Sequence, residues 1–202
     1  MDKPFSQAAE NNKRCILALL SDYLKTAHTV LEIGSGTGQH AVYFAENHPA
    51  LSWQTSDLIH HHAAINQWIA SYPGDNVLAP LALDVSHRET WPTQSYDLIY
   101  SANTAHIMSW AEVLAMLAMV SQSLKPGGHL ILYGPFNRQG EFTSESNANF
   151  DAFLKSREPH MGLRCIDELR VAARDQQLIL KKIHEMPVNN KIVVFRKECS
   201  DD

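Results

Sequence analysis

The stretch Val-Leu-Glu-Ile-Gly-Ser-Gly-Thr-Gly-Gln-His, residues 30–40, decides the fold of this chain. An apolar, β-branched run leads into three glycines, Gly34, Gly36 and Gly38, and a helical pattern begins at His40. Glycine tolerates a positive φ angle and lets the backbone approach a ligand closely. The free N–H groups at a helix start favour an anionic group. The stretch therefore predicts a strand, a ligand-binding loop and a helix, with a tight turn that binds nothing as the alternative.

Short apolar runs alternate with longer helical patterns on both sides of this loop. We expect strands at residues 29–33, 51–56, 76–83, 96–100 and 129–133, and helices at 40–48, 63–71, 110–124 and 166–173. Such alternation indicates βαβ units and a parallel sheet. Two last runs, residues 178–183 and 191–196, are joined by a short turn, which permits antiparallel neighbours only. The chain is therefore expected to be an α/β protein that closes with a hairpin.

Two acidic residues stand at the predicted ends of the second and third strands. Asp57 lies where an α/β sheet places the acid that accepts bonds from both ribose hydroxyls of a nucleotide. Asp84 ends the third strand in the run Leu-Ala-Leu-Asp-Val. The alternative for each is a capping role for the helix or turn that follows. Because open sheets bind ligands at the carboxyl ends of their strands, we favour a ligand site there.

The spacing of the loop separates two classes of nucleotide-binding protein. The dinucleotide fingerprint requires a third glycine at the position of Gln39. With its G-x-G-x-G spacing and the preceding acid Glu32, residues 30–133 resemble the class I S-adenosylmethionine-dependent methyltransferases. The resemblance implies an α/β, Rossmann-like three-layer sandwich with a seven-stranded, mostly parallel sheet and a C-terminal antiparallel hairpin.

The same resemblance implies a cofactor site for S-adenosylmethionine, which would leave as S-adenosylhomocysteine. Glu32 and the loop residues Gly34, Ser35, Gly36 and Gly38 would hold the methionine end of the cofactor. Asp57, with Leu58 beside it, would bind the ribose, and Asp84 would accept from the adenine amino group while Val85 supplies a backbone contact. Asn103 is expected to hydrogen-bond to the cofactor or the acceptor.

The acceptor side is expected after the fourth and fifth strands. His106 is a candidate base because histidine titrates near neutrality, with a buried and satisfied histidine as the alternative. Tyr133 is a second candidate catalytic residue, and the polar segment that begins there is predicted to be a binding loop, or else a solvated one. The predicted substrate-binding residues are Phe136, Asn137, Asn147, Phe150, Asp151 and Asn189. Residues 133–151 and 186–190 also resemble a small uncharacterised group of methyltransferase-like proteins of unknown substrate.

Composition excludes several classes of function. The chain has 202 residues and a net charge of −5, which argues against a phosphate-tracking surface and therefore against nucleic acid. No apolar run is long enough to span a membrane, and no signal peptide begins the chain, so a cytoplasmic location is expected. The three cysteines lie far apart, and the adjacent residues His60, His61 and His62 would point in different directions on a helix. No metal site is therefore expected.

We expect a single methyltransferase domain over residues 1–202, divided into three parts. Residues 1–27 are predicted to form an N-terminal helical extension or lid, in which Asn11, Asn12 and Arg14 are candidate contacts. Residues 28–133 form the cofactor-binding half, and 134–202 the substrate loop and closing hairpin. The leading function is methyl transfer to a small molecule. The alternatives are an NAD-dependent oxidoreductase and a non-catalytic S-adenosylmethionine-binding protein. The acceptor, its reacting atom, the use of a base and the oligomeric state are left open.

Overall fold

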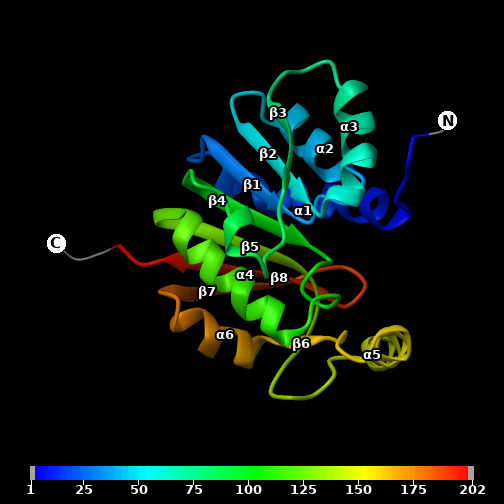
Figure 1. The fold of residues 1–202 in the computed structure, drawn as a ribbon. Helices are drawn as coiled ribbons and strands as arrows, with labels where there is room; N and C mark the ends of the chain where they lie inside the picture. The colour runs from blue at the N-terminus through cyan, green and yellow to red at the C-terminus, as the bar shows by residue number, and fades with distance from the viewer. Residues whose placement is uncertain (1–2, 200–202) are drawn as a thin grey trace.

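The computed structural model describes residues 3–199 and has an α/β architecture (Figure 1). Its strands are β1 (Thr29–Ile33), β2 (Ser52–Asp57), β3 (Val77–Ala82), β4 (Tyr96–Ala102), β5 (Leu124–Asn137), β6 (Arg164–Cys165), β7 (Leu178–Glu185) and β8 (Asn190–Lys197). Its α-helices are α1 (Gln7–Leu24), α2 (Gln39–Asn47), α3 (His62–Ala70), α4 (Trp110–Ser123), α5 (Glu145–Arg157) and α6 (Ile166–Arg174). Two short 3-10 turns cover Ile59–His61 and Arg88–Thr90.

The strands form one mixed sheet in the order β3-β2-β1-β4-β5-β8-β7. β1 to β5 run parallel to one another, whereas β8 runs antiparallel to both β5 and β7. The predicted seven-stranded sheet with its closing hairpin is therefore confirmed. A two-residue strand, β6, adds to it by pairing with the end of β5, where Phe136 lies opposite Arg164. The carboxyl ends of β1, β2, β3 and β4 consequently point to one edge of the sheet, as a parallel arrangement requires.

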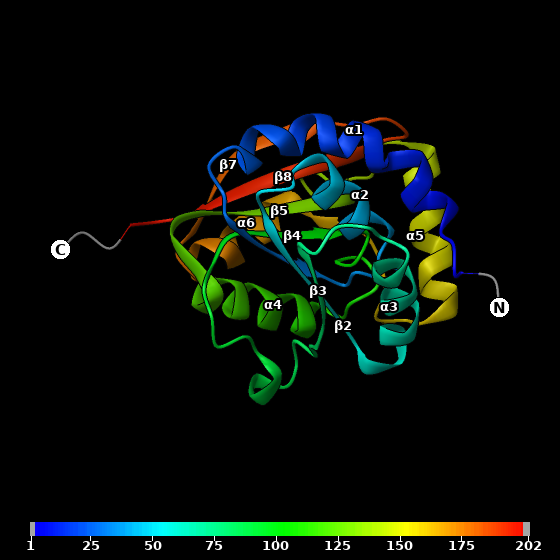
Figure 2. The ribbon, with the colours of Figure 1, turned by 90° about the horizontal axis from the view of Figure 1, so that it is seen from above.

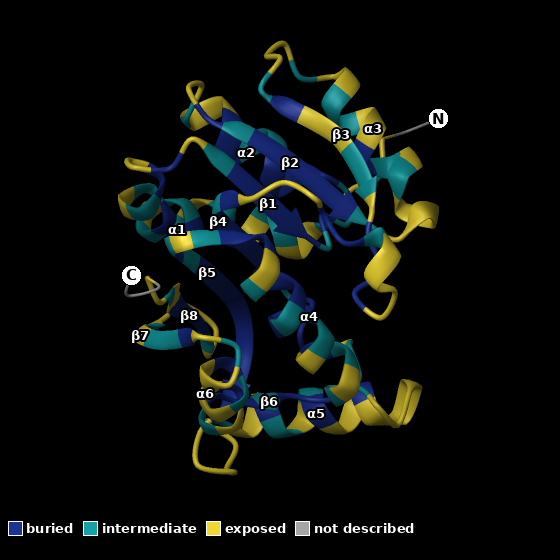
Figure 3. Ribbon diagram, turned by 60° about the vertical axis from the view of Figure 1, so that its left-hand side comes forward, coloured by how far each residue is buried: buried dark blue, intermediate teal, exposed yellow. Residues whose placement is uncertain are grey.

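Helices cover both faces of the sheet, and Figure 2 shows α1 and α2 on one side with α4 and α6 on the other. On the first side, Ile16 and Leu20 of α1 pack in one core cluster with Phe44 of α2. On the second side, α4 buries Val113 and Leu117. Burial on both faces explains why β1 and β4 are almost wholly buried in Figure 3, with continuous apolar runs in the sequence.

The segment after Tyr133 differs from the expected irregular loop. β5 continues to Asn137, and residues 145–157 form α5. This helix lacks an apolar stripe, since its buried residues are Asn147, Asp151 and Leu154, so the usual periodicity is missing. Its N-terminus is nevertheless marked in the sequence by Ser144, whose side chain accepts from the Asn147 N–H at 3.1 Å.

The N-terminal extension is helical as predicted, and α1 accounts for most of it. Ser6 caps the helix by accepting from the Ala9 N–H, and Ile16, Leu20 and Leu24 form its buried face. The predicted divisions 1–27 and 134–202 also include residues 1–2 and 200–202, which lie outside the described residues.

Candidate functional site

The glycine loop that follows β1 is held in a conformation that depends on glycine. Gly34 has a φ angle of +71°, and a Cβ atom there would lie 2.8 Å from the Thr104 Oγ1. The loop is fastened to β2 because the Ser35 N–H donates to the Ser56 carbonyl at 2.9 Å, and Ser35 Oγ accepts from the Ser56 N–H. The backbone at Gly34 is therefore fixed close to the loop that follows β4, where no larger residue fits.

Glu32 lies within β1 and is only 2% exposed. The Trp53 Nε1 donates to its Oε2 at 3.2 Å. Burial raises the pKa of Glu32 to about 7, and the bonds from Trp53 and Ser35 oppose this shift. A carboxyl group with this pKa changes its charge near neutral pH, and a cation placed beside it would favour the ionised form.

The two predicted nucleotide-binding acids both hold backbone groups at the strand ends. Asp57 accepts from the Gly36 N–H at 2.7 Å through Oδ2 and from the Leu58 N–H at 2.7 Å through Oδ1. Asp84 accepts from the Ser86 N–H at 2.9 Å. These bonds are the capping roles considered as alternatives. They do not exclude ligand binding, because each carboxylate oxygen can accept a further bond.

Two adjoining cavities lie at the glycine loop. The first, here called the strand-end cavity, has a volume of about 180 Å³ and is lined by Gly34, Asp57, Leu58, Asp84 and Val85, among others. The second, the loop cavity, has a volume of about 420 Å³ and is lined by Glu32, Gly34, Ser35, Gly36 and Asn103, among others. The structure therefore brings nine of the ten predicted cofactor residues to two cavities that share Gly34.

Gly38 is the exception among the predicted cofactor residues. It precedes α2 with a φ angle of +89°, and a Cβ atom there would lie 3.2 Å from the Ile65 Cα. Gly38 therefore permits α2 and α3 to pack closely, and it lines neither of the two cavities.

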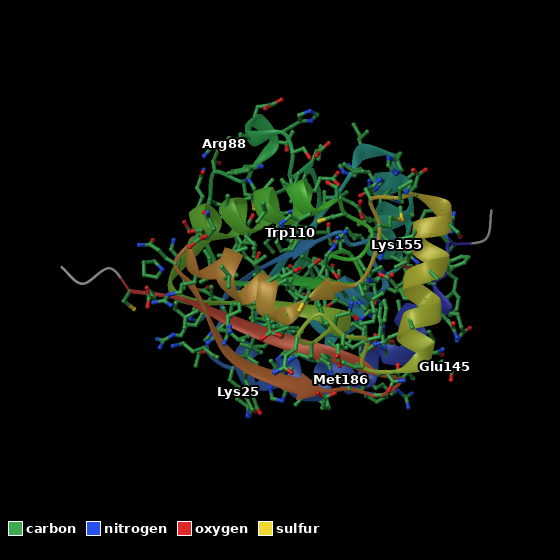
Figure 4. The ribbon with its side chains drawn as sticks, turned by 90° about the horizontal axis from the view of Figure 1, so that it is seen from below. Lys25, Arg88, Trp110, Glu145, Lys155 and Met186 are labelled. Atoms are coloured by element: carbon green, nitrogen blue, oxygen red, sulfur yellow. The ribbon has the colours of Figure 1, made fainter. Side chains whose placement is uncertain are left out.

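A third space, here called the large cavity, has a volume of about 650 Å³ and adjoins the loop cavity at Ala8 and Asn103. Four regions that are distant in the sequence line it: α1, the end of β4 with β5, α5, and the turn between β7 and β8. Asn11, Asn12 and Arg14 of the extension, which are the predicted candidate contacts, line it. Figure 4 shows α5 from Glu145 to Lys155 beside the end of the hairpin near Met186.

Hydrogen bonds join α5 to that hairpin turn. The Asn147 Nδ2 donates to the Asn189 carbonyl at 3.3 Å, and the Asn189 Nδ2 donates to the Ser146 Oγ at 3.1 Å. Asn189 therefore holds the cavity wall together, while its neighbours Val188 and Asn190 line the cavity.

His106 lines the large cavity and is buried. Its ring meets the Phe150 ring edge-on with the centroids 5.3 Å apart. Burial and the nearby Arg164 guanidinium lower the pKa of His106 to about 4. Arg164 is itself fixed by donating to the carbonyls of Ala105, Met108 and His160. The His106 ring is therefore neutral at pH 7 and is a weaker base than an ordinary histidine.

Tyr133 also lines the large cavity, and burial raises its pKa to about 12. The nearby side chains of Asn12 and Asn190 oppose this rise in the pKa. Asn12 in turn shares a 2.7 Å hydrogen bond between its Oδ1 and the Nε2 of His40, a buried residue whose pKa falls to about 4. Tyr133 therefore keeps its proton at neutral pH, and the nearby Asn12–His40 bond joins α1 to α2.

The remaining substrate-binding predictions divide into two groups. Asn147 and Phe150 line the large cavity. Phe136 packs in the core beneath α4, and Asn137 is buried beside it without lining the cavity. Asp151 accepts from the Leu163 N–H at 2.8 Å and pairs with Lys155 at 2.7 Å, which fixes the end of α5. Phe136, Asn137 and Asp151 therefore do not line the large cavity, and their predicted role in substrate binding stays a prediction.

Several lining residues were not singled out from the sequence. Ala8, Cys15, Pro135 and Ser146 contribute to the large cavity. His40 lines the loop cavity. Its position directly after the glycine loop was a usable signal, because the first residues of that helix must face the same ligand space. The sequence contains no comparable signal that would place Ala8, Cys15, Pro135 or Ser146 at the large cavity.

Among residues 3–199, no group of three or more His, Cys, Asp or Glu residues is arranged to hold a metal ion. His60 and His61 lie ring to ring with centroids 4.1 Å apart, on the short turn before α3. Within the same residues, none of the helices has both the length and the apolar character needed to cross a bilayer.

Several solved structures with this fold are described as methyltransferases. An O-methyltransferase family protein from Burkholderia thailandensis has a TM-score of 0.82 and 17% identity, with 96% of this chain and 58% of that chain covered. Human N-acetylserotonin methyltransferase in complex with SAM has a TM-score of 0.78 and 14% identity, covering 96% and 53%. PigF with SAH has a TM-score of 0.80 and 18% identity, covering 94% and 56%. The chain thus spans little more than half the length of these proteins.

The fold is therefore that of the S-adenosylmethionine-dependent methyltransferases. A family model with the description "Protein of unknown function (DUF938)" matches residues 3–197. The chain belongs to this family.

Proposed function

We propose that this protein is an S-adenosylmethionine-dependent methyltransferase that acts on a small molecule. The observation that carries the proposal is the convergence of Glu32, the glycine loop, Asp57 and Asp84 on two adjoining cavities. These residues come from the ends of three neighbouring parallel strands, which is where open α/β sheets bind nucleotides. The solved structures with SAM and SAH support the same cofactor.

The residues present fit this cofactor. The buried Glu32 carboxyl group faces the loop cavity and suits the cofactor's ammonium group. Asp57 and Asp84 keep acceptor capacity for the ribose hydroxyls and the adenine amino group. When bound, S-adenosylmethionine supplies an electrophilic methyl group on a sulfonium.

The acceptor is proposed to occupy the large cavity, because this cavity meets the loop cavity at Ala8 and Asn103. His106 and Tyr133 hold neutral rings there at pH 7 and orient the acceptor by hydrogen bonding. Helix α1 and the residues before it cover the cofactor side, where Pro4, Ser6 and Ala9 line the loop cavity and exclude water. Alignment of the two reactants in a closed space is the main contribution that such a site makes to the rate.

The geometry of Gln39 disfavours the NAD-dependent alternative. Its side chain exchanges hydrogen bonds with the Ser6 backbone, so it fills the position at which a dinucleotide fold needs its third glycine. A non-catalytic binding protein is distinguished by its inability to transfer the methyl group. The cytoplasmic location and the absence of a nucleic-acid partner stay predictions.

Calorimetry with S-adenosylmethionine, S-adenosylhomocysteine and NAD tests the proposal directly. We expect one molecule of either sulfur nucleotide to bind per chain and NAD not to bind. Binding of NAD alone would overturn the proposal. Transfer is then measured with methyl-labelled S-adenosylmethionine and a mixture of small metabolites, and binding without transfer to any compound favours the non-catalytic alternative.

A further inference from the structure

The charges around the large cavity point to a class of acceptor. Resting on the proposed function, we propose that the acceptor is a small organic anion with an apolar or aromatic body, and that its negative group pairs with Arg14. Arg14 lines this cavity, and the other lining residues, among those the structure describes, include no aspartate, glutamate or lysine. The one lining histidine, His106, has a pKa of about 4 and is neutral at pH 7.

Arg14 is available to a ligand. Its side chain is exposed, and within residues 3–199 it makes no ion pair or hydrogen bond through its guanidinium. Two of the nearby acids are already paired, Glu10 with Lys13 at 2.6 Å and Glu185 with Lys191 at 2.5 Å. Glu145, at the start of α5, does not line the cavity. A guanidinium without a protein partner, in a cavity without a lining carboxylate, attracts an anion and repels a cation.

The other walls define the body of the acceptor. Phe150, Pro135, Pro187 and Val188 give the large cavity apolar and aromatic surfaces. Asn103 and Asn147 add neutral amides that recognise polar atoms without requiring a second charge. A single cation cannot neutralise several phosphates, so this chemistry selects a compound with one negative group and an apolar framework.

The position of Arg14 also orients the acceptor. Ala8 marks the junction with the loop cavity, and Arg14 lies six residues further along α1. At 1.5 Å per residue this separation is about 9 Å along the helix axis. The anionic group therefore binds away from the cofactor, and the methyl-accepting atom is a different atom at the Asn103 end.

Matched pairs of small probes test this assignment on the full chain saturated with S-adenosylhomocysteine. Suitable pairs are 3-(4-hydroxyphenyl)propionate with its amide, and indole-3-acetate with its amide. We expect at least one acid to bind roughly tenfold more tightly than its amide by calorimetry, since only the acid forms a charge-assisted pair. The preference should weaken as salt is added, because the pair is exposed.

Variants of Arg14 distinguish this ion pair from nonspecific binding of the acid. Arg14→Gln should abolish the preference for the acid, Arg14→Lys should retain part of it, and Arg174→Gln, at an exposed arginine at the end of α6, should leave it unchanged. Equal binding of acids and amides, a preserved preference in Arg14→Gln, or no binding of any acid at millimolar concentration would each overturn the proposal.

The cofactor affinity provides an independent control. Arg14 lines neither the loop cavity nor the strand-end cavity, so Arg14→Gln should bind S-adenosylhomocysteine like the wild type. Failure of the wild type to bind this nucleotide contradicts the proposed function, whereas failure of the acid preference with intact nucleotide binding contradicts the acceptor class alone.

Discussion

The loop cavity adjoins both the strand-end cavity and the large cavity, yet the two cofactor-side cavities and the large cavity are assembled in opposite ways. The strand-end and loop cavities take their polar groups mainly from the ends of neighbouring strands and from one loop. The large cavity takes its walls from α1, the end of β4 with β5, α5 and the β7–β8 turn, which come together only in the folded chain. A short motif can therefore identify the first kind of site, whereas the second depends on packing between distant segments.

The largest effect is expected at the tightest point of the cofactor side. In Gly34→Ala, the new Cβ would lie 2.8 Å from the Thr104 Oγ1, and the alanine would have to adopt a φ angle of +71°. We expect an affinity loss for S-adenosylhomocysteine of roughly 100-fold or more by calorimetry, because backbone strain and the clash both displace the loop. Gly36→Ala is the matched control, since its φ angle is also positive but its Cβ meets nothing within 4 Å. Equal losses in the two variants would show that close approach to Thr104 is unimportant.

Asp57 tests whether a strand-end acid does more than hold the loop. Asp57→Ala removes the acceptor for the Gly36 N–H and the proposed ribose contact together. We expect S-adenosylmethionine to bind at least about tenfold more weakly, because charge-assisted hydrogen bonds contribute about 1.5–3 kcal/mol. Asp175→Ala, at an exposed position after α6, is the control. Unchanged affinity in a folded Asp57→Ala protein would remove this residue from the site.

A variant of Asn12 tests the large cavity, whose walls come together by packing between distant segments. Asn12→Ala leaves the buried His40 Nε2 without its 2.7 Å partner. We expect the free energy of unfolding to fall by about 1–3 kcal/mol in urea denaturation, the cost of an unsatisfied buried polar group. The neighbouring Asn11→Ala changes an exposed side chain and should stay within about 0.5 kcal/mol of the wild type. Similar values for both variants would mean that α1 is not held through this bond.

The smallest effect concerns the charge of Glu32. Its raised pKa of about 7 means that the free protein loses a proton from this residue when a cationic ammonium group binds beside it. The affinity for S-adenosylmethionine should therefore rise by up to about tenfold between pH 6 and pH 8. At higher pH a larger fraction of Glu32 is already ionised in the free protein, so binding no longer has to remove its proton. Glu32→Gln should bind more weakly and show a flat dependence. A pH-independent affinity in the wild type would show that Glu32 does not bind the ammonium group of the cofactor.

Much of the fold and of the cofactor side was predictable because the signals are local. The glycine loop, Asp57 and Asp84 each stand at the end of an apolar run, and a parallel sheet places such ends together. Gly38 shows the limit of this reasoning, because a Cβ there would meet the backbone of α3 and the residue lines neither cofactor-side cavity.

The acceptor side was only partly predictable for a physical reason. Helix α5 buries Asn147 and Asp151 and carries few apolar residues, so its pattern resembles that of a solvated loop. Phe136 and Asn137 lie on a strand that extends beyond its expected end, where it pairs with β6, and both residues are buried. Neither feature can be read from periodicity, because both depend on partners far away in the chain.

Ala8 and Asn103, which belong to the walls of both the loop cavity and the large cavity, have a consequence for finding the acceptor. Two ligands that share walls influence each other's binding, and thermodynamic linkage makes this influence reciprocal. The factor by which the nucleotide changes the affinity for the acceptor equals the factor by which the acceptor changes the affinity for the nucleotide. A compound library can therefore be screened without any assay of turnover, by recording which compounds shift the dissociation constant of S-adenosylhomocysteine.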